Sequence, residues 1–289
     1  MPHHQRNILL ISGLLLLFTL SLEAQIALQL KLKDTRYLRY EPIDLTLIIR
    51  NNSGNTLIFG DSDINNGRIF FEVCGQNGKI APVFDKSANP ASGLILAAGD
   101  TRELRVSINM LHDMQREDNY SITAYLNHDR LSRTHLSNTV DLEVVEGLRI
   151  AEKNVGLPSV DDSSVIKSIQ LLLLLFDAKE EKLYCLRAQD EENVYAVFRL
   201  GPYISGSKPQ IEIDGSSSIH ILIQVRPRLY SYLIYGFVER NLRLRQQRYY
   251  VPANGTPTLD RQTGFLRVAQ ARVATEGTDY RTLSPEKQQ

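Results

Sequence analysis

The fold class is decided by residues 43–59, which read IDLTLIIRNNSGNTLIF. In the first half of this stretch, Leu45, Leu47 and Ile49 stand at every second position. A period of two is that of a β-strand with one buried face. The polar segment 51–55 is rich in residues that favour turns, and a second apolar run follows it. The pattern of strand, turn and strand predicts antiparallel β-structure.

The same pattern extends in both directions, from residue 25 to about residue 146. Further strand-like runs are Leu28–Leu32, Arg68–Cys74, Thr101–Asn109, Tyr120–Leu126 and Val140–Val144. Turn formers separate these runs, among them an Asn-Gly pair at 77–78 that favours a hairpin. Roughly seven or eight short strands, with a turn every 8 to 12 residues, are typical of a β-sandwich. We therefore expect a sandwich domain over residues 25–146.

The segment from Tyr40 to Gly54 resembles the opening strands of Ig-like domains in secreted bacterial proteins. The resemblance covers about a third of the chain and implies an Ig-like fold without implying an activity. The chain has no Trp, so it lacks the Cys–Trp–Cys core of antibody domains.

The segment that follows is less regular, and we expect a linker or short helix over residues 147–170. Residues 153–158 end in Gly-Leu-Pro, and Asp161–Ser164 could cap a short helix. The next run, Leu171–Phe176, is apolar at every position. Such a run predicts a strand or helix segment buried on both sides, and it is too short to cross a membrane.

Residues 171–274 predict a second antiparallel β domain with repeats that resemble propeller blades. Acidic turns begin at Asp177, Asp214 and Asp260, each followed by polar residues and an apolar strand. Their spacings are close to the roughly 40–45 residues of a propeller blade. Too few units are present to close a propeller, which needs about four. The alternative is that unrelated hairpins share the same turn chemistry.

True repeats would place equivalent residues alike, so Leu183, Ile219 and Phe265 are expected to face one shared core. An incomplete set leaves an apolar surface that must be covered by the run 171–176, by the first domain, or by another chain. Residues 275–289 are polar and are expected to form a loose tail.

The N-terminal residues 1–24 have the pattern of a signal peptide. Arg6 precedes an apolar run from Ile8 to Leu22, and Ala24 is a small residue where a peptidase could cut. The apolar run is shorter than the roughly 20 residues of a membrane-spanning helix. We predict a secreted or periplasmic protein whose mature chain starts near Gln25; retention of the segment as an anchor is the alternative.

The charge of the chain limits the kinds of binding partner to expect, and its two cysteines indicate the state of the thiols. Lys+Arg and Asp+Glu both number 33, so the formal net charge is zero. Without a basic excess, nucleic acid is not an expected partner, whereas self-association is compatible with neutrality. Cys74 and Cys185 lie in different predicted domains and apolar runs, so buried free thiols are expected, with a disulfide between them left open.

Residues 61–72 contain the oxygen spacing of a calcium loop. Asp61, Asp63, Asn65 and Glu72 occupy its positions 1, 3, 5 and 12. The glycine falls one position late for an EF-hand, and the flanks have strand patterns. A type I′ turn at Asn66-Gly67 is the alternative that we favour. Beyond this Ca²⁺ candidate, no cofactor is expected.

Three histidines lie near one another in sequence. His112 and His128 fall at opposite ends of the predicted strand 120–126, and His135 follows. The distance between the ends of a strand argues against one shared metal, so we expect solvated loop histidines.

Aromatic and basic residues gather near the C-terminal end of the second domain. The candidate ligand-binding residues are Arg226, Arg228, Tyr230, Tyr232, Tyr249 and Tyr250. Tyrosine and arginine together suit contacts with sugar rings or a protein surface, although rings on alternate strand faces are the commoner arrangement.

The common catalytic motifs, including the phosphate-binding loop, the dinucleotide fingerprint and the zinc-protease helix, are absent from the sequence. We therefore predict an exported, non-catalytic binding protein for a protein or glycan outside the cytoplasm. One alternative is a secreted hydrolase with a carboxylate site in the C-terminal domain. Another is a structural subunit of a surface assembly.

Overall fold

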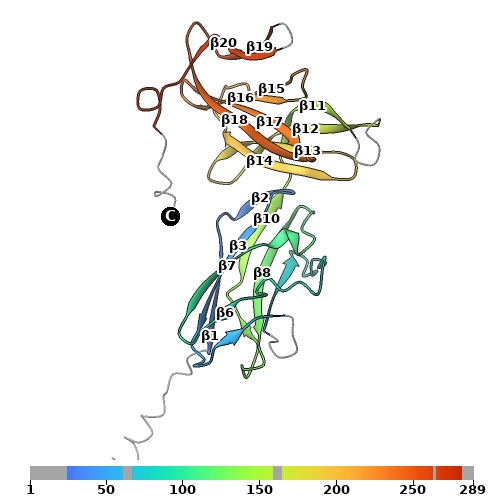
Figure 1. Ribbon diagram of the computed structural model, residues 1–289, viewed down its shortest axis with the longest axis vertical. Coiled ribbons are helices and arrows are strands. Elements are labelled where there is room, and N and C mark those ends of the chain that lie inside the picture. Colours follow the sequence, from blue (N-terminus) through green and yellow to red (C-terminus); the bar gives the residue numbers. More distant parts are fainter. Residues whose placement is uncertain (1–24, 61–66, 159–164, 263–264, 282–289) are drawn as a thin grey trace, which may run out of the picture.

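The computed structural model describes residues 25–60, 67–158, 165–262 and 265–281. In these residues the chain is all-β, as the alternating pattern predicts, with a single 3-10 turn at Ile108–Met110. Figure 1 shows two β domains stacked along the long axis of the molecule. The predicted signal segment 1–24 and the calcium-loop residues 61–66 lie outside the described residues.

The first domain consists of two principal sheets. One contains β1 (Ile26–Leu32), β3 (Asp44–Asn51) and β7 (Thr101–Ser107), in the order β1-β3-β7. The other has the order β2-β10-β8-β5, with β2 (Arg36–Leu38), β10 (Val140–Val145), β8 (Asp118–Asn127) and β5 (Arg68–Gly75). Short additions are β9 (His135–Leu136) on β8, and the pair of β4 (Leu57–Ile58) and β6 (Ile95–Leu96).

The alternation in β3 explains how these sheets meet. Leu45, Leu47 and Ile49 are fully buried in one core with residues of the opposite sheet, such as Ile122 and Leu126 of β8. Burial of one face of each sheet makes the domain a sandwich. Its strand order, with β5, β8 and β10 as neighbours, is compatible with that of Ig-like sandwiches. The Ig-like assignment itself stays a prediction.

The second domain also consists of two sheets. One has the order β11-β12-β13-β14, with β11 (Leu148–Pro158), β12 (Ile166–Asp177), β13 (Lys182–Gln189) and β14 (Val194–Pro202). The other has the order β15-β16-β17-β18-β21, with β15 (Gln210–Ile213), β16 (Ile219–Arg226), β17 (Leu229–Val238), β18 (Asn241–Pro252) and β21 (Ala271–Val273). A separate hairpin contains β19 (Thr258–Gln262) and β20 (Phe265–Ala269).

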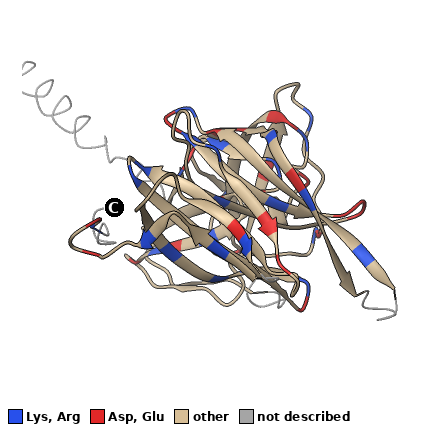
Figure 2. Ribbon diagram, turned by 90° about the horizontal axis from the view of Figure 1, so that it is seen from above, with Lys and Arg blue, Asp and Glu red and all other residues tan. Residues whose placement is uncertain are grey.

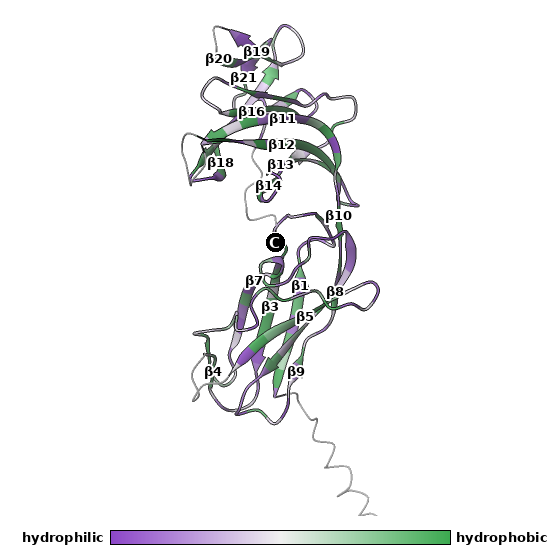
Figure 3. Ribbon diagram, turned by 90° about the vertical axis from the view of Figure 1, so that its right-hand side faces the viewer, coloured by the Kyte–Doolittle hydropathy of each residue, from purple (hydrophilic) through white to green (hydrophobic). Residues whose placement is uncertain are grey.

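Both sheets of the second domain are antiparallel meanders that pack face to face. Leu173 and Leu186 of one sheet share a buried cluster with Ile221 and Leu233 of the other. Figure 3 shows the two sheets as adjacent layers above the first domain, with hydrophobic colour along β12, β13 and β16.

The prediction of a linker or short helix over 147–170 is wrong where the structure describes it. Residues 148–158 form β11, which pairs with β12 along nearly its whole length. Ala151, Val155 and Leu157 pack on the second core from this strand. Charged residues between them, Glu152 and Lys153, interrupt the alternation of apolar and polar residues that would have predicted a strand. Only Glu146 and Gly147 separate β10 of the first domain from β11 of the second.

The expected equivalence of the three acidic turns is also wrong. Asp177 ends the second strand of its sheet, Asp214 follows the first strand of the other, and Asp260 lies inside β19. Leu183 and Ile219 belong to different clusters, and Phe265 is 78% exposed. Similar turn chemistry therefore produced the apparent repeat at these positions.

The expected loose tail begins later than residue 275. Asp279 pairs with Arg272 through two hydrogen bonds of 2.7 and 2.6 Å, and it accepts another from the backbone N–H of Thr275. Tyr280 packs against Tyr249 with ring centroids 4.8 Å apart. Residues 275–281 are thus held against β18 and β21, while 282–289 lie outside the described residues.

Within the described ranges, no helix has the length and apolar character needed to cross a membrane. Figure 2 shows acidic and basic residues interspersed over the strands, in keeping with the net charge of zero.

Candidate functional site: the cleft between the domains

The two domains meet through β12, whose apolar residues point to both faces of the sheet. Leu171 and Leu173 belong to the core of the second domain. Leu172, Leu174 and Phe176 belong instead to a separate cluster that includes Leu38 of β2 and, at its margin, Val145 of β10. The run that is apolar at every position thus serves two cores.

Ion pairs between the domains surround this apolar contact. Arg199 of β14 bonds to both carboxylate oxygens of Glu41, and its Nη1 lies 3.0 Å from Asp34 Oδ2. On the other side, Arg187 of β13 donates from Nη1 to both oxygens of Glu146, at 2.8 and 3.0 Å. The first set joins β14 to loops of the first domain, and the second joins β13 to the junction between the domains, so together they fix the relative placement of the two domains.

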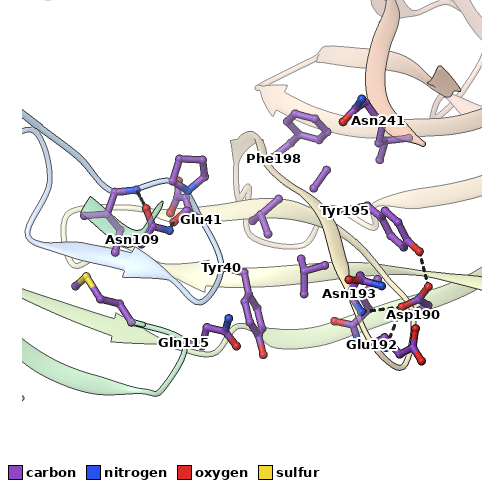
Figure 4. A pocket seen from close by; sticks show the side chains of 18 of the residues that line it. Tyr40, Glu41, Asn109, Gln115, Asp190, Glu192, Asn193, Tyr195, Phe198 and Asn241 are labelled. Carbon is purple, nitrogen blue, oxygen red and sulfur yellow. Dashed lines mark hydrogen bonds between the residues drawn. The ribbon is translucent and has the colours of Figure 1, made fainter. Parts of the chain in front are cut away.

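Beside this interface lies a cleft of about 710 Å³. Its volume falls within the range of roughly 300–1,000 Å³ that is usual for ligand sites. Figure 4 shows side chains from both domains around it. The first domain contributes residues that include Tyr40, Glu41, Asn109, Met114 and Gln115, and the second contributes Gln189, residues 190–198, Asn241 and Leu242.

The turn between β13 and β14 gives the cleft an acidic wall. Asp190, Glu191 and Glu192 are consecutive there, and the last two are exposed. A hydrogen bond from the Tyr195 hydroxyl, together with backbone N–H donors of the turn, lowers the pKa of Asp190 despite some desolvation. Asp190 is therefore an anion at neutral pH, and the wall attracts cationic groups.

Tyr40 forms part of the opposite wall. Its φ of 69° is in the left-handed region, which is strained for a residue with a side chain. The guanidinium groups of Arg39 and Arg187 lie 4.7 and 5.5 Å from its ring centroid. These cation–π contacts hold the ring in place across the domain boundary.

The six predicted Tyr and Arg residues do not form one patch. Tyr230 and Tyr250 are directly paired on β17 and β18, so they share the outer face of their sheet, and Tyr232 lies on the same face. Tyr249 is on the opposite face, where it lines a smaller hollow of about 310 Å³ with Arg226. Arg228, with φ 61°, is exposed in the turn between β16 and β17. Their role in binding stays a prediction.

Tyr232 instead ends a buried polar chain that the sequence did not reveal. His220 contacts Tyr232 Oη through Nδ1 at 2.6 Å and Asp214 Oδ2 through Nε2 at 3.0 Å. Burial alone would raise the pKa of Asp214, but hydrogen bonds from His220, Ser216 and backbone N–H groups lower it to about 2. Burial raises the pKa of Tyr232 to about 12. The folded chain thus stabilises the charged form of Asp214 and keeps Tyr232 neutral, and the three side chains anchor the turn after β15.

The calcium candidate can be followed only in part. Asp61, Asp63 and Asn65 lie outside the described residues, whereas Glu72 is in β5 and accepts a hydrogen bond from Tyr125 at 3.3 Å. The type I′ turn that we favoured at Asn66-Gly67 includes Asn66, which also lies outside the described residues, so this alternative stays a prediction. Gly67 is closely packed, because a Cβ on it would come within 2.7 Å of Phe59 and His128. No group of three or more potential metal ligands occurs among the residues that the structure describes.

The expectation of solvated histidines is wrong. His112, His128 and His135 are 3%, 9% and 5% exposed, and burial lowers the pKa of each. They fill the margins of the sandwich core, where His112 and His128 contact backbone carbonyls of Ala81 and Ile58.

Both cysteines are free thiols, as expected. Cys185 is fully buried in the interdomain cluster, and burial raises its pKa to about 12. Cys74 is only partly buried, which differs from the prediction, because it lies on the outward face of β5 together with Phe70 and Glu72.

The acidic side chains whose pKa is shifted in this structure all favour the ionised form, which bears on the alternative of a hydrolase. The pKa values of Asp85, Asp190, Asp214 and Asp279 are all lowered by hydrogen bonds. A general acid for glycoside hydrolysis needs a carboxyl whose pKa is raised. These four carboxylates are therefore suited to structural contacts or to binding cations.

Two comparisons with known proteins bear on the chain's family. No protein-family model matches the chain, and no curated protein is significantly similar to it in sequence.

Proposed function

We propose that the chain is an exported binding protein that takes a protein or glycan ligand into the cleft between its two domains, without catalysing a reaction. The observation that carries this proposal is the cleft itself, which has the volume of a ligand site and is lined by both domains. Export is inferred from the signal-like pattern of residues 1–24.

The lining is suited to recognition. Amide side chains, carboxylates and the rings of Tyr40 and Tyr195 surround one hollow. Carboxylates and amides can orient a polar ligand, while the rings offer apolar contact area. Ion pairs on both sides of the domain interface fix the walls before a ligand arrives, which reduces the entropy lost on binding.

The proposal is tested by a screen of the purified protein against glycans and peptides, followed by calorimetry on the hits. The double variant Glu191→Lys/Glu192→Lys reverses the charge of the acidic wall. For a neutral or cationic ligand in the cleft, we expect affinity to fall by about tenfold or more.

The matched control is Glu180→Lys/Glu181→Lys, which makes the same change in the exposed turn between β12 and β13, away from the cleft lining. It should bind like the unmodified protein. Equal loss of affinity in both variants, or a screen without saturable binding, would contradict the cleft as the site.

A further inference from the structure

We propose that the ligand is an extended peptide carrying Lys or Arg, which pairs with the free edge of β14 and becomes a fifth strand of that sheet. This inference rests on the proposed function, because it places the peptide in the same cleft.

The cleft reaches the edge of β14 and not just one of its faces. Five consecutive residues, 194–198, line it. Successive side chains of a strand point to opposite faces, so a hollow touching every residue of a run lies along the strand's edge. Within the described chain β14 pairs only with β13, which leaves the outward backbone N–H and C=O groups of this edge open.

The two edges of this sheet differ in the features that discourage strand pairing. At the other edge, β11 carries the charged residues Arg149, Glu152 and Lys153 along its length, whereas a terminal proline is common to both strands, Pro158 in β11 and Pro202 in β14. Charges are a usual protection of an exposed edge. Residues 194–198 of β14 read VYAVF, with no charge and no proline. Their high β-propensity suits pairing with an added strand.

Aromatic contacts hold the open edge in shape. Phe198 stacks on Tyr235 of β17 with ring centroids 5.2 Å apart, and Tyr195 meets Phe237 edge-on at 6.4 Å. Both rings thus pack against the facing sheet. A strand that is ordered in advance loses less entropy when a peptide pairs with it.

Charge determines what kind of peptide fits. The acidic wall, Asp190 to Glu192, comes directly before β14, so it lies at one end of the docking edge. At the other end, Arg199 is already engaged by Glu41 and Asp34. Lys167 lies near Asp190, and Arg240 acts on Tyr195, so the three carboxylates of the acidic wall face two cations. The charge that remains at this end of the edge is negative, which favours a peptide with a basic residue near the β13–β14 turn.

The position of the edge favours a single peptide over a second copy of the chain as the partner. The cleft is bounded by residues 40–43 of the first domain and by Asn241 and Leu242 of β18. A single extended segment enters between these walls, whereas the edge of an intact sheet brings a whole domain with it. Peptide addition to a sheet edge draws affinity from main-chain hydrogen bonds and specificity from alternate side chains.

The experiment uses a short peptide in which lysine and valine alternate, together with two relatives. One relative is N-methylated at alternate residues, which removes ladder donors and keeps the charge, and the other has glutamate in place of lysine. We expect the parent peptide to bind the purified protein, and both relatives to bind about a hundredfold more weakly. Amide exchange of residues 194–198 should slow in the complex with the parent peptide.

Several outcomes overturn the inference. Binding that is insensitive to N-methylation and leaves the β14 amides unprotected would show a ligand in the cleft without strand addition, and the proposed function would survive. Protection of residues 194–198 through a concentration-dependent dimer would identify a second copy as the occupant. If neither the peptides nor the glycans bind, the proposed function fails as well.

Discussion

At the scale of single residues, Arg199 links the second domain to two carboxylates of the first. Its guanidinium bonds to Glu41, whose side chain is only 12% exposed, and to Asp34. It also lies 5.5 Å from the ring centroid of Phe176. Removing one partner of a mostly buried pair leaves the other charge poorly solvated, so the loss exceeds that at an exposed pair.

We expect Arg199→Ala to lower the free energy of unfolding by about 1–3 kcal/mol in urea titrations. The control Arg102→Ala breaks the exposed pair with Asp100 and should cost less than about 0.5 kcal/mol. Equal effects of the two substitutions would mean that Arg199 does not support the interface.

Asp214 gives a second prediction at this scale, in the pH dependence of stability. Its pKa is lowered to about 2 in the folded chain from an ordinary value of 3.8. The unfolded chain therefore binds this proton more readily, and the stabilisation is complete above about pH 4 and lost as the pH falls through 2. Its size is about 2 kcal/mol.

The variant Asp214→Asn tests this contribution. The difference in unfolding free energy between it and the unmodified protein should be largest near neutral pH and shrink between pH 4 and 2. The exposed control Glu180→Gln should follow the unmodified protein throughout. A difference that does not change with pH would show that the carboxylate charge contributes nothing.

At the scale of elements, β12 shows both the reach and the limit of the sequence pattern. The unbroken run 171–176 predicted burial on both sides, and each face has its own cluster. The pattern could not predict that the second face of β12 packs against the first domain. The spacing of apolar residues indicates which side chains are buried, but it does not indicate which element covers them. β11 was missed since charged residues such as Lys153, which pairs with Glu212, interrupt its inward face.

Leu173 and Leu174 are neighbours in β12 that serve different cores. Each substitution to Ala should lower the free energy of unfolding by about 2–5 kcal/mol, because both side chains are fully buried. Only Leu174→Ala should also speed proteolysis at the domain junction, because Leu174 packs in the cluster between the domains and its loss makes local opening of the junction easier. Junction cleavage enhanced equally by both variants would contradict the division of β12 between two cores.

The candidate site was the least predictable element. Tyr40 and residues 190–198 are about 150 positions apart in the sequence, and nothing local marks them as neighbours. The signal that could have suggested the β14 edge is the uncharged run VYAVF after an acidic turn. The Tyr and Arg cluster near the C-terminus drew attention instead, because composition alone does not assign residues to the two faces of a sheet.

At the scale of the whole molecule, three features make the two domains one frame. They are the apolar cluster around Leu38 and Leu174, the ion pairs of Arg187 and Arg199, and a junction of two residues, Glu146 and Gly147. A Cβ on Gly147 would come within 3.0 Å of Leu174 and 3.1 Å of Leu38, so the junction itself is closely packed. Most domain pairs joined by a small polar interface move relative to each other. These two domains are expected to form a rigid pair. Because both domains line the cleft, the cleft keeps its shape only if the domains do not move relative to each other.

The distance between spin labels on the two domains tests this rigidity most directly. Arg105 of β7 and Arg243 of β18 are exposed strand positions and can be replaced by labelled cysteines, with Cys74 changed to Ser. A rigid frame gives one narrow distance distribution that does not change when a ligand is added. A broad distribution, or one that narrows only with ligand, would show that the domains move freely and that the cleft is not a preformed site.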